Sequence, residues 1–197
     1  MNNFVYTIGT KLYINLTNKC SNNCDFCIRK THDGMEGQPL WLEDTPEATD
    51  IADQLPENLD EYDNEVVFCG FGEPTFNFDV MCDIADFLHT VGKTTRVNTN
   101  GQGNLICNRD ITEDIVACID VINVSLNASN AKSYQTVCHS RYGEEAFDEM
   151  INFAVSCKKR GAKVVFSVVD SIGAKEINAC QRLADKNNIP LRVREKK

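Results

Sequence analysis

The sequence predicts an α/β fold built on a mostly parallel sheet, and three observations indicate it. Six long β-prone runs occur along the 197 residues, and all but the last are followed by helical patterns. Turn-forming glycines and polar residues stand at the carboxyl ends of several runs. The composition, 42% hydrophobic and 25% charged, is that of an ordinary globular protein with a sizeable core. We therefore expect one domain, residues 1–197, in which crossover helices cover a parallel sheet.

The first elements are a hairpin, a strand and a short helix. Residues 4–6 and 11–17 are β-prone runs on either side of a glycine-containing turn, which predicts a small hairpin that feeds the first long strand. A helix is expected over residues 45–55, with Thr45 as its cap and Pro46 in its first turn, where proline is well tolerated.

The remaining chain repeats strand then helix. Strands are expected at 65–69, 94–98, 120–126, 163–169 and 190–195, and helices at 77–91, 110–118, 131–138, 144–160 and 174–188. The alternation by itself does not separate an open doubly wound sheet from an incomplete barrel. Six units are too few for a closed eight-stranded barrel.

Targeting and redox signals favour the cytoplasm. The N-terminus lacks a basic region before an apolar core, and no apolar run is long enough to cross a bilayer. Ten cysteines could form a disulfide framework, but several occupy apolar helical positions, where cysteine acts as a small buried hydrophobe. We therefore expect free thiols in a reducing compartment. The three histidines are isolated, and His89, on a predicted helix, is expected to be structural.

The formal net charge of −9 is concentrated in one segment. Twelve acidic residues and no basic ones lie between Asp33 and Glu65. We expect this segment to form a solvated acidic face, which would repel a nucleic-acid backbone. A nucleic-acid substrate that meets another face stays possible.

Three cysteines provide the strongest chemical signal. Cys20, Cys24 and Cys27 have the spacing C-x3-C-x2-C directly after the first long strand. Structural zinc sites usually take four ligands as two close pairs, and the sequence contains no second close pair. Three soft ligands without a local fourth favour an iron–sulfur cluster that keeps one iron open. A zinc-binding module is the alternative.

A second motif, Cys69-Gly70-Phe71-Gly72-Glu73-Pro74-Thr75, follows the next strand. Two glycines and a proline are compatible with an ordinary tight turn. They also let the backbone approach a ligand closely, with Glu73 at the rim of a site. Polar residues recur at the ends of later strands, where an α/β fold places its ligands.

The two motifs together resemble those of the radical S-adenosylmethionine (SAM) enzymes, in which an aromatic residue, here Phe26, precedes the third cysteine. The resemblance implies a partial (β/α)6 TIM-type barrel. It also implies that Cys20, Cys24 and Cys27 hold three irons of a [4Fe–4S] cluster and that SAM binds the fourth. Over nearly the whole chain, the sequence resembles radical SAM proteins associated with TatD-family nucleases, which suggests a functional association with such a nuclease.

The resemblance also assigns SAM contacts at the strand ends. The backbone of Phe26 would meet the adenine, and the segment with Gly70, Gly72 and Glu73 would meet the amino group of SAM. Further contacts are expected from polar or apolar residues at later strand ends, namely Asn98, Asn100, Ser125, Asn127, Ser167, Val169 and Arg192. Arg192 or Arg194 could meet the SAM carboxylate or a substrate anion, and solvation at the surface is the alternative for each arginine. No catalytic side chain is assigned.

The implied activity is reductive cleavage of SAM to a 5′-deoxyadenosyl radical that abstracts hydrogen from a substrate under anaerobic conditions. The substrate class is open between a small molecule, a peptide and a nucleic-acid component. An external donor such as a flavodoxin or ferredoxin would supply the electron. Two alternatives are a glycyl-radical enzyme activase and a non-enzymatic Fe–S electron carrier.

Overall fold

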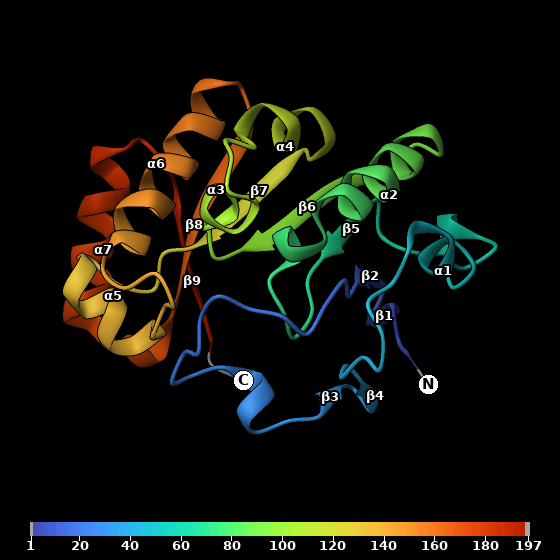
Figure 1. Cartoon of the computed structure of the whole chain (residues 1–197), viewed down its shortest axis with the longest axis horizontal. Helices are drawn as coiled ribbons and strands as arrows, with labels where there is room; N and C mark the ends of the chain where they lie inside the picture. Colours follow the sequence, from blue (N-terminus) through green and yellow to red (C-terminus); the bar gives the residue numbers. More distant parts are fainter. Residues whose placement is uncertain (1, 196–197) are drawn as a thin grey trace.

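The computed structural model describes residues 2–195 and contains one large sheet covered by helices (Figure 1). Its seven strands, in spatial order, are β1 (Val5–Ile8), β2 (Lys11–Ile14), β5 (Glu65–Phe68), β6 (Thr94–Thr99), β7 (Val121–Ser125), β8 (Lys163–Val169) and β9 (Leu191–Arg194). A separate two-stranded ribbon pairs β3 (Gly34–Met35) with β4 (Gln38–Pro39). This ribbon was not expected from the sequence.

The sheet confirms the predicted fold class. The strands from β2 to β9 pair in parallel, and β1 pairs antiparallel with β2 as the expected hairpin. Parallel neighbours need crossovers, and helices provide most of them. In the described part of the chain, β1 and β9 are the edges of the sheet, so the curved structure is a partial barrel.

Seven α-helices connect the strands of the described chain. They are α1 (Ala48–Ala52), α2 (Phe78–Thr90), α3 (Gly103–Cys107), α4 (Thr112–Cys118), α5 (Ala131–Cys138), α6 (Glu145–Lys159) and α7 (Ala174–Lys186). The predicted start of the first helix was wrong. Glu47 caps α1 through a reciprocal arrangement with Asp50, so Thr45 and Pro46 precede the helix. Helix α3 was missed, because a single turn is too short to show a period.

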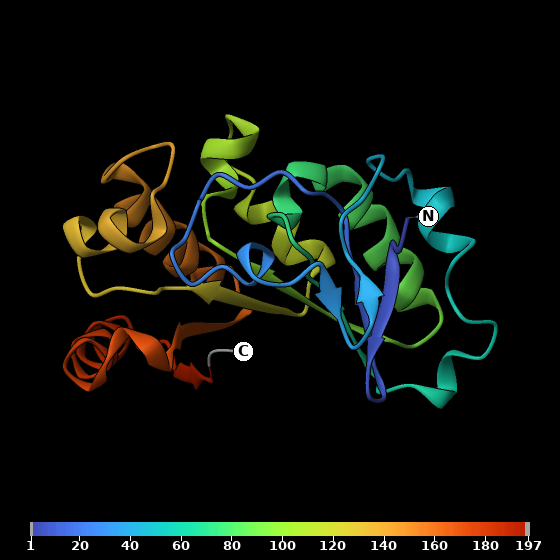
Figure 2. The same ribbon diagram turned by 90° about the horizontal axis from the view of Figure 1, so that it is seen from below.

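The two faces of the sheet differ in chemistry. Side chains such as Ile14, Phe68 and Phe166 point toward the helices and form the main apolar core. Figure 2 shows most helices on one side of the sheet. On the concave face, a small second core of Tyr6, Leu40 and Phe71 covers the β1–β2 edge. The rest of the concave face mixes polar side chains, such as Asn98 and Ser125, with valines, and it carries several of the expected contacts.

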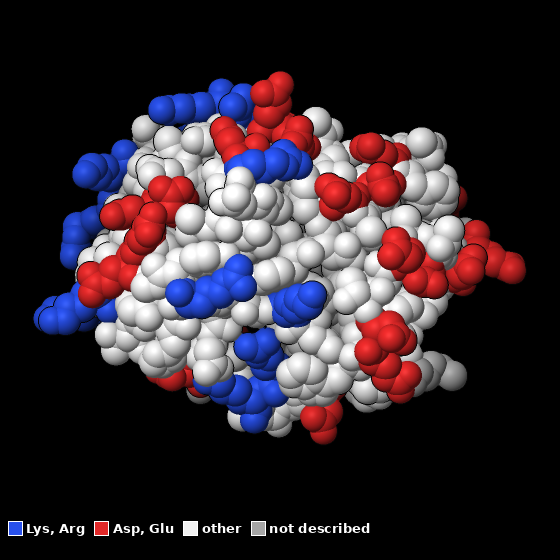
Figure 3. Space-filling view, in the orientation of Figure 1, with Lys and Arg blue, Asp and Glu red and all other residues white. Residues whose placement is uncertain are grey.

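The acidic segment forms a charged side of the molecule, as expected. Figure 3 shows Asp and Glu gathered on the side where Figure 1 draws α1 and α2. Among the described residues, no helix combines the length and the apolar character that a membrane span requires.

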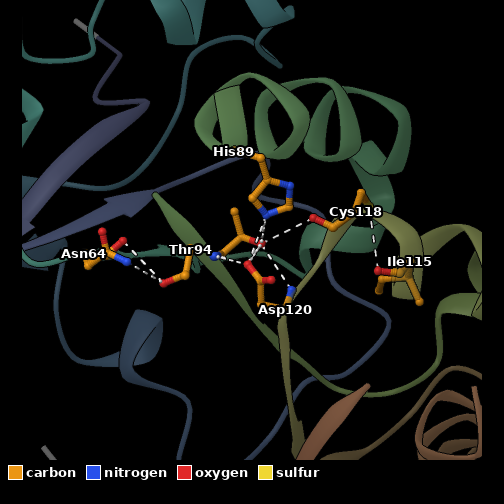
Figure 4. Close-up of polar contacts among 7 residues, drawn as sticks. Asn64, His89, Thr94, Ile115, Cys118 and Asp120 are labelled. Carbon is orange, nitrogen blue, oxygen red and sulfur yellow. Dashed lines mark hydrogen bonds and ion pairs between the residues drawn. The ribbon is translucent and has the colours of Figure 1, made fainter. Parts of the chain in front are cut away.

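His89 is structural, as expected. Its Nε2 lies 3.0 Å from Asp120 Oδ2 and 3.3 Å from Thr95 Oγ1. Figure 4 shows His89 on α2 and Asp120 before β7 pointing toward one another. The Asp120 carboxylate also accepts a hydrogen bond of 2.7 Å from the Thr95 backbone N–H. The cluster therefore ties α2 to the amino-terminal ends of β6 and β7, away from the strand ends that carry the motifs.

Replacement of Asp120 by asparagine is expected to lower the free energy of unfolding by about 1 kcal/mol at pH 7, because the side chain is partly exposed to solvent. Burial opposes ionisation, but the bonds from Thr95 and His89 outweigh it and hold the pKa of Asp120 below its ordinary value. This stabilisation is present above the unfolded pKa of about 3.9 and is lost as the pH falls through the folded value.

Urea unfolding of the wild type and of Asp120→Asn, measured between pH 7 and about pH 3.5, tests this expectation. The difference between the two proteins should shrink toward acid pH. Asp83→Asn, at an exposed position of α2, is the matched control and should show little deficit at any pH. A deficit of Asp120→Asn that does not change with pH would contradict the electrostatic account.

Candidate functional site

The cysteine-bearing loop, residues 15–30, lies across the carboxyl ends of the strands and is tied to the segments that follow them. The Glu73 backbone N–H donates a 2.8 Å hydrogen bond to the Lys19 carbonyl. The Asn23 N–H donates a 2.9 Å bond to the carbonyl of Cys138 at the end of α5. Backbone hydrogen bonds therefore hold the loop both at the end of β5 and at the end of α5. These bonds fix the path of the loop and do not involve its cysteine side chains.

The glycines of the second motif allow this close approach. A Cβ on Gly72 would lie 2.2 Å from the Thr17 carbonyl oxygen and 2.6 Å from the Lys19 carbonyl oxygen. A Cβ on Gly70 would lie 1.9 Å from Asn15 Oδ1. All three distances are far inside van der Waals contact, so only glycine lets the loop sit on the end of β5. The motif is therefore a packing surface for the loop.

The three cysteines of the loop are free, half-buried thiols. Burial is the main cause that raises the pKa of Cys20, to about 12. The pKa of Cys24 is raised by its hydrogen bond with the thiol of Cys138 and by burial. Within residues 2–195, no three His, Cys, Asp or Glu side chains are close enough to hold one metal ion.

The donor set nevertheless fits an iron–sulfur cluster. Three thiols on one loop provide the soft ligands that such clusters take, and Gly70 and Gly72 let this loop pack directly against the end of β5. All three thiols must lose their protons on binding, and their burial makes this loss costly until a metal compensates the charge. Cys138, beside Cys24, is a fourth thiol that the sequence analysis did not single out.

The sequence predicted that Glu73 lies at the rim of the site, and this prediction was wrong. The Glu73 side chain is buried. Its Oε1 accepts hydrogen bonds from Thr99 Oγ1 at 2.6 Å and from Thr75 Oγ1 at 3.0 Å. Its Oε2 accepts a bond from the Asn100 N–H at 2.6 Å. Burial raises the pKa of this carboxyl, although these hydrogen bonds act in the opposite direction. The side chain thus joins the ends of β5 and β6 in this structure.

A buried polar network supports the loop from below, and it was not predicted from the sequence. Gln102 Nε2 donates bonds of 2.9 Å to Asn22 Oδ1 and to the Tyr134 hydroxyl, and Gln102 Oε1 accepts a bond from Ser140. Asn22 Nδ2 also donates to Tyr134 at 2.9 Å. Only the glycine-flanked position of Gln102 in Asn100-Gly101-Gln102-Gly103 marked this region in the sequence.

A pocket of about 600 Å³ opens beside the loop, between the ends of β7 and β8 and helix α5. Phe26 and Asn127 both line it, which brings together two of the expected cofactor contacts. Asn127 has a positive φ of 58°, and its buried Oδ1 has no hydrogen-bond partner among the described residues. An unpaired buried acceptor is costly, so this oxygen is available to a ligand.

The other expected contacts divide into two groups. Asn100 is already engaged, because its Nδ2 donates to Ser21 Oγ at 2.8 Å and its Oδ1 accepts from the Gln102 N–H. The remaining residues share the concave face through the strand register, which pairs Asn98 with Asn123, Ser125 with Ser167, Ser167 with Arg192 and Val169 with Arg194. The structure therefore brings both groups to the same end of the sheet as the loop.

Comparison with known proteins identifies the family. The family model described as the Radical SAM superfamily matches residues 14–181. A structure of TYW1 with a lysine–pyruvate adduct bound has a TM-score of 0.65 at 17% identity, over 95% of this chain and 65% of that one. Native anSMEcpe with bound AdoMet has a TM-score of 0.65 at 14% identity, over 94% of this chain and 50% of that one.

A radical SAM methyltransferase from Sphaerobacter thermophilus has a TM-score of 0.60 at 14% identity, over 97% of this chain and 68% of that one. These likenesses establish the fold. The chain spans between half and about two thirds of the length of these solved structures. No curated protein matches the sequence closely enough to count as a relative.

Proposed function

We propose that the chain, which belongs to the radical SAM superfamily, is an enzyme that acts on a substrate with a reactive C–H bond. Members of this superfamily use a [4Fe–4S] cluster and SAM. The observation that carries the proposal is the fit between the cysteine loop and Gly72, which seats the loop on the end of β5. A simple electron carrier has no need of the pocket that opens beside this loop.

In this proposal, Cys20, Cys24 and Cys27 hold the cluster. When bound, the reduced cluster and SAM supply a 5′-deoxyadenosyl radical that takes a hydrogen atom from the substrate. Phe26 and the unpaired Oδ1 of Asn127 would bind the nucleoside part of SAM in the adjoining pocket. An external donor of the flavodoxin or ferredoxin class supplies the electron.

The other residues of the site would orient SAM, support the cysteine loop and enclose the substrate. Glu73 would receive the amino group of SAM if one of its present donors gives way, because both of its oxygens accept hydrogen bonds from the protein. Gln102 and Tyr134 hold the loop by way of Asn22 and do not meet the ligand. The concave face below would take the substrate and keep water from the reacting atoms.

The test is anaerobic reconstitution of the full chain with iron and sulfide, followed by dithionite reduction and addition of SAM. We expect about four irons per chain, 5′-deoxyadenosine as a product, and an electron paramagnetic resonance signal that changes when SAM is added. Samples without dithionite or without SAM are the controls. A complete cluster that shows neither the spectral change nor the product would refute the enzyme and leave an electron carrier.

A further inference from the structure

Three arginines share the concave face of the sheet. The register pairs Arg96 with Val67 and with Val121, so its side chain leaves β6 on the same face as theirs. Arg192 and Arg194 pair with Ser167 and Val169 and share that face through β8. Continuous register from β5 to β9 links these positions, because paired residues in a parallel sheet point the same way.

These arginines outnumber their counter-ions. Glu65 is the one acidic residue in the seven strands, and its Oε1 lies 3.2 Å from Arg96 Nε, an ion pair without hydrogen-bond alignment. Within the described chain, Arg192 and Arg194 have no ion pair. The Nε of Arg194 is buried without a hydrogen-bond partner.

The charges lie close enough to act on one another across the curved sheet. Burial lowers the pKa of Arg194, the neighbouring Cys69 opposes this, and the positive charges of Arg192 and Arg96 lower it further. Burial raises the pKa of Tyr13, and the positive charges of Arg96 and Arg192 both act to lower it. Arg96 and Arg194 are partly buried, whereas Arg192 is exposed. Partly buried cations beside a further positive charge are unfavourable unless an anion compensates them.

The neighbouring surface is open and basic. Figure 3 shows Lys and Arg gathered around a hollow in the middle of the face, where Figure 1 draws the cysteine loop and the end of β9. An anionic molecule could therefore approach the concave face from this side, attracted by the local charge although the chain as a whole is acidic. A further unpaired atom on the same face, the buried Oδ1 of Asn98, can accept a bond from a ligand hydroxyl or amine.

We propose that Arg96, Arg192 and Arg194 bind an oxyanion, a carboxylate or phosphate group of the substrate, on the concave face beneath the cysteine loop. Guanidinium groups suit this task, since each presents a planar fork of donors that matches either oxyanion. The identification of the bound molecule as the substrate rests on the proposed function. The anion site itself does not, because it consists of strand residues that need no cluster.

Anion binding to the reconstituted full chain tests this proposal. Inorganic phosphate and succinate are titrated calorimetrically, each against chloride at equal ionic strength, and thermal unfolding is followed in parallel. At ten times its dissociation constant, the bound anion should raise Tm by about 3 °C or more. Arg194→Gln and Arg96→Gln should each weaken binding by about tenfold or more, because each removes a charge-assisted contact.

Two controls keep the test sharp. Arg182→Gln, at an exposed position of α7, should bind the anion as the wild type does. Arg194→Lys, which keeps the charge but loses the fork, should retain part of the affinity and guards against a variant that fails to fold. Binding of phosphate alone indicates that the substrate is a phosphate ester. Binding of both phosphate and succinate indicates a site that accepts carboxylate as well as phosphate groups.

Three outcomes would overturn the proposal. In the first, neither probe binds more tightly than chloride. In the second, Arg182→Gln weakens binding as much as Arg194→Gln. In the third, SAM competes with phosphate, which would assign the arginines to the carboxylate of SAM. The spectral response to SAM is recorded on the same samples. A protein that responds to SAM but binds no oxyanion refutes the anion site alone, and the converse result refutes the radical SAM function alone.

Discussion

Replacement of Cys24 by alanine is expected to reduce iron binding from about four irons per chain to less than one, and to lower SAM cleavage by at least ~10³-fold. The physical reason is that the loop itself, residues 15–30, carries no fourth cysteine that could replace a missing ligand. Cys24 lies at the centre of the spacing, between Cys20 and Cys27. Anaerobic reconstitution with iron analysis measures the first effect, and 5′-deoxyadenosine formation the second.

The neighbouring thiol makes this prediction specific. Cys138 is buried and in hydrogen-bond contact with Cys24, so it is the nearest candidate for a substitute ligand. Cys138→Ala should keep its iron and lose about 1 kcal/mol of stability, because it empties a small buried volume. If Cys138→Ala instead lost iron as completely as Cys24→Ala, the ligand set would have to include Cys138. Cys157→Ala, in the core of α6, controls for the loss of a buried thiol elsewhere.

The motifs that were readable from the sequence are local. Cys20, Cys24 and Cys27 lie within one loop, and Gly70 and Gly72 lie within one turn, so their spacing in the chain already limits their spacing in space. The parallel sheet was predictable for a similar reason, because strand and helix periods are local and their alternation permits few topologies. Family comparison then confirms the fold that the motifs implied.

The support beneath the loop was not readable, because it depends on contacts between distant segments. Gln102 meets Asn22 across 80 residues, and Asn22 meets Tyr134 across 112 residues. No period or spacing encodes such a pair. The same holds for the burial of Glu73, whose partners Thr99 and Asn100 come from the next strand. Helix α1 shows a different failure, since a capping box at Glu47 displaced the more common threonine cap.

The register of the sheet decides what the concave face contains, and it too is a tertiary property. Arg96 follows an exposed and a buried threonine in the sequence, with no sign of the arginines at 192 and 194 that will share its face. Only the pairing from β5 to β9 places them together. A shift of one residue in any strand would send its arginine to the helical side.

Replacement of Gly72 by alanine is expected to release the cysteine loop from the sheet. The new Cβ would meet two backbone carbonyls, those of Thr17 and Lys19, at 2.2 and 2.6 Å. Backbone atoms cannot rotate away as a side chain can, so the loop must move and the 2.8 Å bond from the Glu73 N–H to Lys19 must lengthen or break. Overpacking and the lost bond together should cost about 2–4 kcal/mol of unfolding free energy.

The effect on iron should exceed the effect on stability, because the loop carries all three cluster cysteines. We expect Gly72→Ala to retain less than about a tenth of the wild-type iron after gel filtration. The reason is that a displaced loop no longer holds its three cysteines in the arrangement that binds the cluster. Gly143→Ala is the matched control: its Cβ meets nothing within 4 Å, and only its φ of 66° makes alanine unfavourable. That variant should lose about 1 kcal/mol but keep its iron. Wild-type iron content and an unchanged spectral response to SAM in Gly72→Ala would show that the loop is not seated on this glycine when the cluster is bound.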